Sequence, residues 1–431
     1  MKALWTVLLL ELRRLVRSRT AAVLVAVCAA WMFVLPRIMT SDGTAEGTRA
    51  LMVQLSLGGA FAICCISLAV SGACSLSRER EEHRLALSRV RPASRFTLAF
   101  GRIVALAILG AVALGVCCAI LCIRSGGERG CDHVISPVME SPREEAEKMY
   151  ARYHSLLPKL DDPDAPQELV DVLTAMTNAP KATVIRMFTQ KAMDRYEIVA
   201  TNTTASWRFD IPEEISAGRL SVRMRFSSDF NLRDNVNGIF AFGGCSGCVS
   251  NITKTVAKIP LNDVCEETPA GRLLFTNTGD NTLMLRPRKD IKILVPADSF
   301  GANMLRAYLQ LVSILAAICA FAVFLGSCLG RTVAVFSCMV MLFVGAVSSD
   351  VIVSYPDQLE SDRIDRISLA ITRTVEMASR PLSSFSPVSS LANDECIEPV
   401  QAALVFALDG IVIPVLFAFF CAVAIPRKSE L

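Results

Sequence analysis

The sequence has little of what soluble enzymes use for chemistry. Histidine occurs only at positions 83, 133 and 154, and no Ser/His/Asp set is visible, which argues against hydrolase chemistry. The dipeptide Gly-Lys never occurs, so the phosphate-binding pattern G-x-x-x-x-G-K-[ST] is absent and the chain lacks the common ATP site. The 44 basic and 41 acidic residues nearly balance, which points to no nucleic-acid partner. We therefore expect no catalysis and no cofactor in this chain.

Long apolar runs are what the sequence does have. Hydrophobic residues make up 52% of the chain and charged residues only 20%, and the mean hydropathy is +0.45. Windows with no charge cover residues 20–36, 51–77, 103–123, 307–330 and 332–349, and a sixth at 400–425 contains one acid, Asp409. A helix needs about 20 apolar residues to cross hydrocarbon. The sequence predicts an integral membrane protein with six transmembrane helices in two groups of three.

Lysine and arginine set the expected orientation. They gather before the first span, between the second and third spans, and at the chain end: Lys2, Arg13, Arg14, Arg17, Arg19, Arg78, Arg80, Arg84, Arg89, Arg91, Arg95, Arg102, Arg427 and Lys428. The positive-inside rule places such segments and both termini in the cytoplasm. Residues 1–123 and 303–431 then form two membrane halves in the plasma membrane (the inner membrane of a bacterium), and residues 124–302 and 350–399 lie outside.

The outer block at 124–302 shows two patterns. Residues 141–193 are typical of helix, and the run from Ser141 to Glu144 has the form of a capping box with proline at the first helical position. From residue 200 to 297 apolar residues alternate, as in Leu220, Val222 and Met224, between turn-forming stretches. The expected fold is an α-helical polytopic membrane protein. Between its third and fourth helices it carries a large extracytoplasmic α+β insertion resembling a β-sandwich.

Two charged segments flank the first membrane half. Residues 4–17 predict an amphipathic helix on the inner surface, anchored by Trp5. The loop at 78–97 is densely charged, with a break expected at Pro92 and a helix cap at Ser94. Such a loop either presents a short helix to a cytoplasmic partner or only fixes topology, and composition alone favours the second interpretation. The candidate partner-contact residues are Arg78, Glu79, Glu81, Glu82, Arg84, Arg91, Pro92 and Arg95.

Five of the 16 cysteines lie outside the predicted spans, at positions 131, 245, 248, 265 and 396. An odd count leaves at least one without an intramolecular partner. In an oxidising compartment the pattern favours a disulfide among Cys131, Cys245, Cys248 and Cys265. Inert thiols are the second interpretation, and a metal site is the third because Cys245 and Cys248 lack a second pair at suitable spacing. We expect no metal.

Two charged residues lie in or at the predicted spans. Asp409 is either functional or satisfied by a neighbouring helix, and Pro414, five residues later, predicts a kink beside it. Arg306 opens the fourth span, where it either lines a pathway mouth or snorkels to the interface, and we favour the interface.

The order of elements resembles the membrane subunit of type-2 ABC transporters, the six-span permease class. The likeness rests on the basic surface helix at 12–19, on the inner loop and on two outer segments. In the inner loop, Glu81 and Glu82 precede a short apolar run, the turn at 91–96 and Gly101-Arg102. The outer segments are residues 299–306 and the proline-rich stretch 379–387. His83-Arg84 stands where the family often has Gly-Thr, and the outer insertion is larger than in most members.

The resemblance implies a permease subunit of an ATP-driven exporter. Two permease chains would pair, a separate ABC ATPase subunit would bind ATP, and residues 78–97 would couple the two proteins. The alternative is a non-transporting membrane anchor for an outer binding or assembly domain. A third hypothesis is a secondary carrier that uses Asp409 as its proton or ion site.

Overall fold

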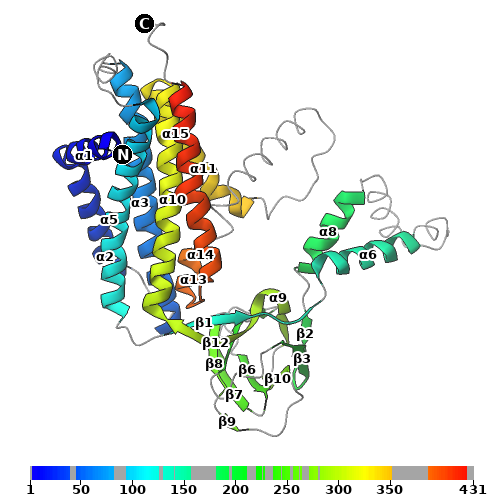
Figure 1. Cartoon of the computed structure of the whole chain (residues 1–431). Helices are drawn as coiled ribbons and strands as arrows, with labels where there is room; N and C mark the ends of the chain where they lie inside the picture. Colours follow the sequence, from blue (N-terminus) through cyan, green and yellow to red (C-terminus); the bar gives the residue numbers. More distant parts are fainter. Residues whose placement is uncertain are drawn as a thin grey trace. The chain divides into compact units, whose positions relative to one another are not determined.

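The computed structural model describes residues 2–38, 45–81, 94–125, 130–139, 141–156, 181–193, 197–210, 220–225, 227–228, 236–243, 245–252, 256–261, 263–264, 271–279, 282–351 and 387–424. They form two compact units, shown in Figure 1. The helical unit comprises Met1–Cys131, Asp298–Tyr355 and Leu359–Leu431. The strand-rich unit comprises Asp132–Ala297 and Pro356–Gln358.

The helical unit is built from long apolar helices. Its elements are α1 (Lys2–Arg17), α2 (Thr20–Ile38), α3 (Ala45–Glu81), α5 (Arg95–Ser125), α10 (Phe300–Cys328), α11 (Arg331–Val351), α13 (Pro387–Ala392), α14 (Pro399–Val405), the π-helical segment η3 (Phe406–Val412) and α15 (Ile413–Ala424). Segments α14, η3 and α15 follow one another without a break and make one continuous rod.

Four helices are long and apolar enough to cross a membrane: Thr48–Ser77, Arg95–Arg124, Phe300–Cys328 and Pro399–Ala424. A fifth candidate is the bent pair Leu4–Arg17 and Thr20–Leu35. The expectation of six spans is therefore met only as four or five within the described residues. For the fifth predicted span, the part of α11 whose side chains are described, Arg331–Phe343, is apolar helix, and the span itself stays a prediction. These helices make the chain a multi-pass membrane protein.

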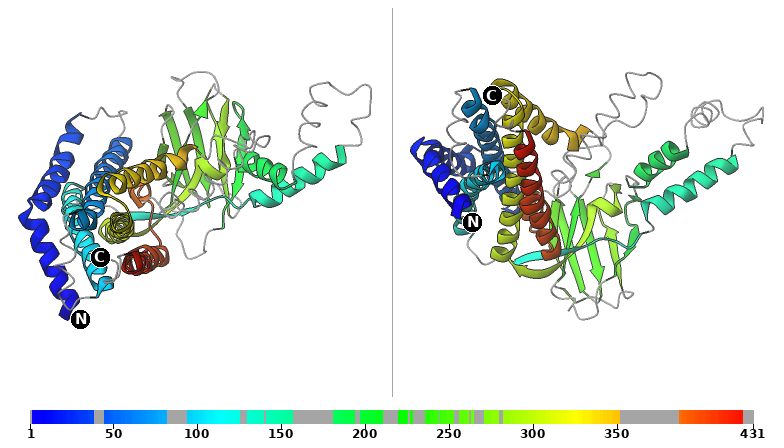
Figure 2. Two further views of the ribbon diagram at one scale, coloured as in Figure 1. Left: turned by 90° about the horizontal axis from the view of Figure 1, so that it is seen from above. Right: turned by 45° about the horizontal axis from the view of Figure 1, so that its top comes forward.

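Helix α10 lies at the centre of the helical unit, between α3, α5 and the last span (Figure 2, left). It is the most buried of the candidate spans, with 61% of its apolar window covered. Small residues allow this close packing. A Cβ atom at Gly326 would lie 2.3 Å from the Ala73 carbonyl oxygen, so α10 and α3 touch through their backbones there.

Within the described residues, the strand-rich unit has twelve short strands in three sheets. The first sheet runs β1 (Gly130–Ile135), β12 (Ile291–Ser299), β4 (Ser221–Arg225), β8 (Val256–Pro260). The second runs β3 (Thr204–Arg208), β10 (Arg272–Asn277), β6 (Val236–Phe242), β7 (Cys245–Ile252), β9 (Asp263–Val264). The third runs β2 (Glu197–Val199), β11 (Leu283–Leu285), β5 (Ser227–Ser228).

The alternating apolar pattern explains the core of this unit. Leu220, Val222 and Met224 are buried, as are Ile291 and Ile293 on the neighbouring strand β12, which confirms the predicted period of two. These side chains share one core with aromatic residues of the second sheet, in which the Phe240 and Phe275 rings lie 4.6 Å apart.

The strand-rich unit also contains three helices: α6 (Pro142–Leu156), α8 (Lys181–Met193) and α9 (Pro287–Asp290). The Glu144 amide donates to the Ser141 hydroxyl at 3.1 Å, and the Ser141 amide donates to the Glu144 carboxylate at 3.2 Å. This confirms the predicted capping box at the start of α6.

Candidate functional sites in the helical unit

Four of the residues predicted to contact a partner, Arg78, Glu79, Glu81 and Arg95, lie at the end of the bundle where α3 stops and α5 starts. We call this the platform end. Helix α3 runs through Arg78, Glu79 and Glu81, and Arg95 is the first residue of α5. The Thr97 amide donates to the Ser94 hydroxyl at 3.1 Å, which confirms the predicted cap. Glu82, Arg84, Arg91 and Pro92 lie outside the described residues, so their role stays a prediction.

The predicted surface helix is present as α1 and meets α2 at a bend of 62°. The bend occurs at Ser18 and Arg19, and Arg19 has a positive φ of 60°. The Ser18 hydroxyl donates to the Leu15 carbonyl at 2.9 Å, which satisfies one of the acceptors left at the end of α1. Trp5 is 62% exposed, as expected for an interfacial anchor.

A buried ion pair joins α1 to α5 at the platform end. Arg102 is only 4% exposed, and its Nε atom donates to the Glu11 carboxylate at 2.9 Å. Its Nη1 atom lies 3.5 Å from the Ser75 carbonyl of α3. A Cβ atom at Gly101 would lie 2.8 Å from Val7, so α1 and α5 are also in close contact beside the pair.

Sequence reasoning did not single out this pair. The signal was present, because Glu11 is an acid within an apolar helical run and Arg102 stands just before the third apolar window. Each had an ordinary explanation, a solvated face for the acid and the positive-inside rule for the arginine. Only the packing of α1 across α5 shows that the two charges meet.

Asp409 lies in a π-helical segment of the last span. Residue 409 is 6% exposed, and η3 extends from Phe406 to Val412. The Ile413 amide donates to the Leu408 carbonyl, five residues back. Pro414 follows at once, and a proline disturbs an α-helix because it lacks an N–H and crowds the carbonyl four residues back. The widened turn accommodates Pro414, so a π-segment stands where the sequence predicted a kink.

An apolar groove of about 250 Å³ opens beside this segment, between α5, α10 and the last span. Its walls include Ile108, Val312, Phe406 and Val415. Gly410 lines the groove and its neighbour Asp409 does not. Neither Asp409 nor Arg306 lines this groove. Their role in a transport pathway stays a prediction.

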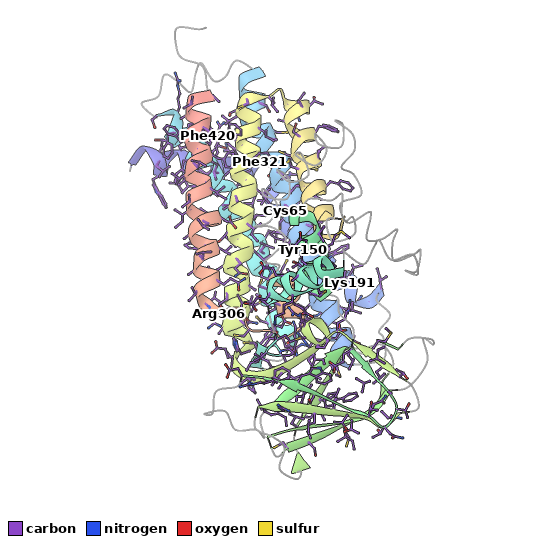
Figure 3. All side chains as sticks on the ribbon, turned by 90° about the vertical axis from the view of Figure 1, so that its right-hand side faces the viewer. Cys65, Tyr150, Lys191, Arg306, Phe321 and Phe420 are labelled. Atoms are coloured by element: carbon purple, nitrogen blue, oxygen red, sulfur yellow. The ribbon has the colours of Figure 1, made fainter. Side chains whose placement is uncertain are left out.

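Arg306 is held at the opposite end of the bundle, near the start of α10 (Figure 3). Its Nη2 atom donates to the Asp298 carboxylate at 2.7 Å. Its Nη1 atom donates to the Cys396 sulfur at 3.4 Å and to the Ile397 carbonyl at 3.2 Å. The guanidinium is thus bound to other residues of the helical unit, and its placement at the membrane interface stays a prediction.

Two further side chains bind residues 387–398, which we call the rim segment. The Asn303 amide donates to the Glu395 carbonyl and accepts from the Ile397 amide, each at 2.8 Å. Arg49 at the start of α3 pairs with Asp394 at 3.3 Å and stacks over the Phe300 ring at 5.3 Å. Asp394 has a positive φ of 56°, so the turn that these side chains hold is a strained one.

The cysteines predicted to pair are placed as follows. Cys131 is fully buried in the helical unit. Cys245 and Cys248 lie three residues apart on β7, which pairs regularly with β6 at both positions, so they point to opposite faces of the sheet. Cys248 is exposed, Cys245 is partly buried, and Cys265 lies outside the described residues. A Cys245–Cys248 disulfide does not fit this strand.

Among the described residues, no group of three or more His, Cys, Asp or Glu side chains is placed to hold a metal ion. No protein family, curated protein or solved structure matches this chain.

Proposed function

We propose that this chain is the membrane-spanning permease subunit of an ATP-driven exporter. In this proposal α2 and α11 complete a set of six spans, both termini are cytoplasmic, and the strand-rich unit is an extracytoplasmic insertion. A separate ATPase subunit binds at the platform end, and a second permease chain completes the transport path in the plasma membrane.

The observation that supports this proposal is the way in which α1 is joined to α2 and α5 at the platform end. A charged helix, α1, leaves the first span at 62° and is tied by Glu11 to Arg102 at the base of α5. In the sequence, the charged residues 78–97 comprise the last residues of α3, the connection to α5 and the first residues of α5. A push on this loop by a partner would reach α3, α5 and α1 together. Such an arrangement transmits force from a soluble motor to helices, which a passive anchor does not need.

Charge reversal tests the loop assignment. The double variant Glu81→Lys and Glu82→Lys should leave the chain in the membrane but uncouple ATP hydrolysis in the partner from export. The matched control is Asp210→Lys, an exposed acid of the strand-rich unit, which should leave coupling unchanged. Purification in detergent should recover an ATPase with the parent chain and less of it with the double variant.

The anchor hypothesis has one observation in its favour, the independent core of the strand-rich unit. It predicts that no ATPase copurifies and that the Glu81 and Glu82 variant behaves like the parent. Orientation is tested separately by cysteine substitutions at Ser88 and Phe230, which the proposal places inside and outside the cell. Labelling of position 88 only from the exterior would overturn the orientation.

A further inference from the structure

Two cysteines far apart in the sequence meet near the start of α10. Cys131 follows α5 in β1 and is completely buried, and Cys396 precedes α14 and is partly exposed. Burial, and after it the neighbouring Cys396, raises the pKa of the Cys131 thiol, so the two side chains are neighbours. The sulfur of Cys396 also lies 4.0 Å from the Asp298 carboxylate.

The surrounding contacts hold Cys396 in this position from several sides. Asn303 binds the residue before Cys396, through the Glu395 carbonyl, and the residue after it, through the Ile397 amide. Arg306 donates to the Cys396 sulfur and to the Ile397 carbonyl. The Asp298 carboxylate in turn accepts a hydrogen bond from Arg306.

The strand that carries Cys131 is held as well. Strands β1 and β12 are neighbours in their sheet. A Cβ atom at Gly130 would lie 3.0 Å from the Asp298 carbonyl oxygen, so the chain passes close to Asp298 just before Cys131. Both cysteines therefore lie beside the same residue, Asp298.

We propose that Cys131 and Cys396 form a disulfide that ties the end of α5 to the start of the last span. The inference rests on the proposed orientation, which places these residues in an oxidising compartment. It replaces the pairing of Cys131 with Cys245, Cys248 or Cys265 that the sequence suggested. The bond would join the rim segment to the start of β1.

The reaction is thiol–disulfide exchange with a disulfide oxidant, such as an extracytoplasmic thiol oxidase in its oxidised form. Cys396 is the more accessible thiol, so its thiolate attacks one oxidant sulfur, forms a mixed disulfide and releases one oxidant thiol. Cys131 then loses its proton and attacks the Cys396 sulfur, which releases the second oxidant thiol. Two electrons and two protons pass from the cysteines to the oxidant.

Mass spectrometry of the full-length protein tests the bond. Membranes from aerobically grown cells are blocked with N-ethylmaleimide, denatured and digested without reductant. We expect a linked peptide pair containing positions 131 and 396 in most of the chains, lost on reduction. The variant Cys396→Ala should convert Cys131 to the alkylated form, and Cys245→Ala, the matched control, should leave the linked pair unchanged.

The outcomes separate this inference from the proposed function. Alkylation of both Cys131 and Cys396 in the parent, or linkage of Cys131 to another cysteine, would overturn the disulfide. A membrane-impermeant maleimide applied to intact cells reports orientation through Cys248, which is exposed on β7. If Cys248 is labelled from outside while Cys131 and Cys396 are both free, the disulfide is wrong and the orientation stands. Export and ATP hydrolysis play no part in either measurement.

Discussion

The two ends of the helical unit are held together by different kinds of contact. Near the start of α10, the side chains of Asn303 and Arg306 form hydrogen bonds with backbone groups of residues 395–397. At the platform end, Glu11 and Arg102 form an ion pair between two side chains, and Arg102 also lies 3.5 Å from the Ser75 carbonyl. A bond to the backbone fixes the path of a segment, whereas two long side chains can follow a tilt of their helices. The difference points to a rigid end and a movable end.

The largest effect is expected from breaking the side-chain contact at the movable end. Glu11→Gln breaks an ion pair in which Arg102 is buried, and breaking a buried pair should cost about 3–5 kcal/mol of stability. Denaturant unfolding in lipid or detergent measures the change. Arg14→Gln is the matched control, because Arg14 also pairs with Glu11, at 3.8 Å, but is 45% exposed. It should cost about 0–1 kcal/mol.

The double variant Glu11→Leu and Arg102→Met sharpens the same test. It removes both charges and should recover most of the stability lost in Glu11→Gln, because no buried charge remains. Export should stay impaired if the pair transmits movement from the platform. Full recovery of both stability and export would show that the pair is a packing feature only.

The next largest effect is expected at the rigid end, from the cysteine pair. Reduction, or the variant Cys396→Ala, should lower the free energy of unfolding by about 2–4 kcal/mol if the disulfide is present. The Cys245→Ala variant controls for loss of a thiol elsewhere. Equal stability before and after reduction would mean that the rim segment is held by Asn303 and Arg306 alone.

The reduced protein should also acquire a pH dependence at this end. Burial raises the pKa of the Cys131 thiol from 9.0 to about 12. The unfolded chain then ionises first, so stability is complete below pH 9 and falls as the pH rises toward 12. Unfolding of reduced parent and reduced Cys131→Ala across this range should diverge. The oxidised protein should lack this contribution because its Cys131 carries no proton.

Two amides on α10 give a smaller and cleaner test. Asn303→Leu leaves a buried carbonyl and a buried amide without their partner, which should cost about 1–3 kcal/mol. Gln310 is also buried, but its Nε2 atom has no hydrogen-bond partner within the described residues. Gln310→Leu should therefore be neutral or stabilising. Equal losses in the two variants, measured by thermal unfolding, would contradict the claim that backbone contacts hold this end.

The smallest effect is expected from the cap at the platform end. Ser94→Ala removes the acceptor of the Thr97 amide and should cost about 1 kcal/mol. Ser94→Asp should keep the cap and the parent stability. A loss of export in Ser94→Ala much larger than this cost predicts would indicate that the start of α5 takes part in coupling.

Local patterns predicted much of the fold. The alternation at 220–224, the capping box at Ser141 and the cap at Ser94 each depend on residues within a few positions, so the sequence alone was sufficient. The rim could not be predicted in this way. Arg306 and Cys396 are 90 residues apart, and nothing near either one indicates the other. The π-helical segment at Asp409 could not be predicted either. A proline indicates that an α-helix is disturbed, but it does not indicate which irregular form the helix adopts.

The chain leaves α5 and returns to α10 at points that touch, as the contact between Gly130 and the Asp298 carbonyl shows. Cys131 could therefore be joined to Asp298 by a two-residue Asn-Gly turn in place of the whole intervening stretch. Replacement of the strand-rich unit by another domain at this junction should therefore need no redesign of the helical unit.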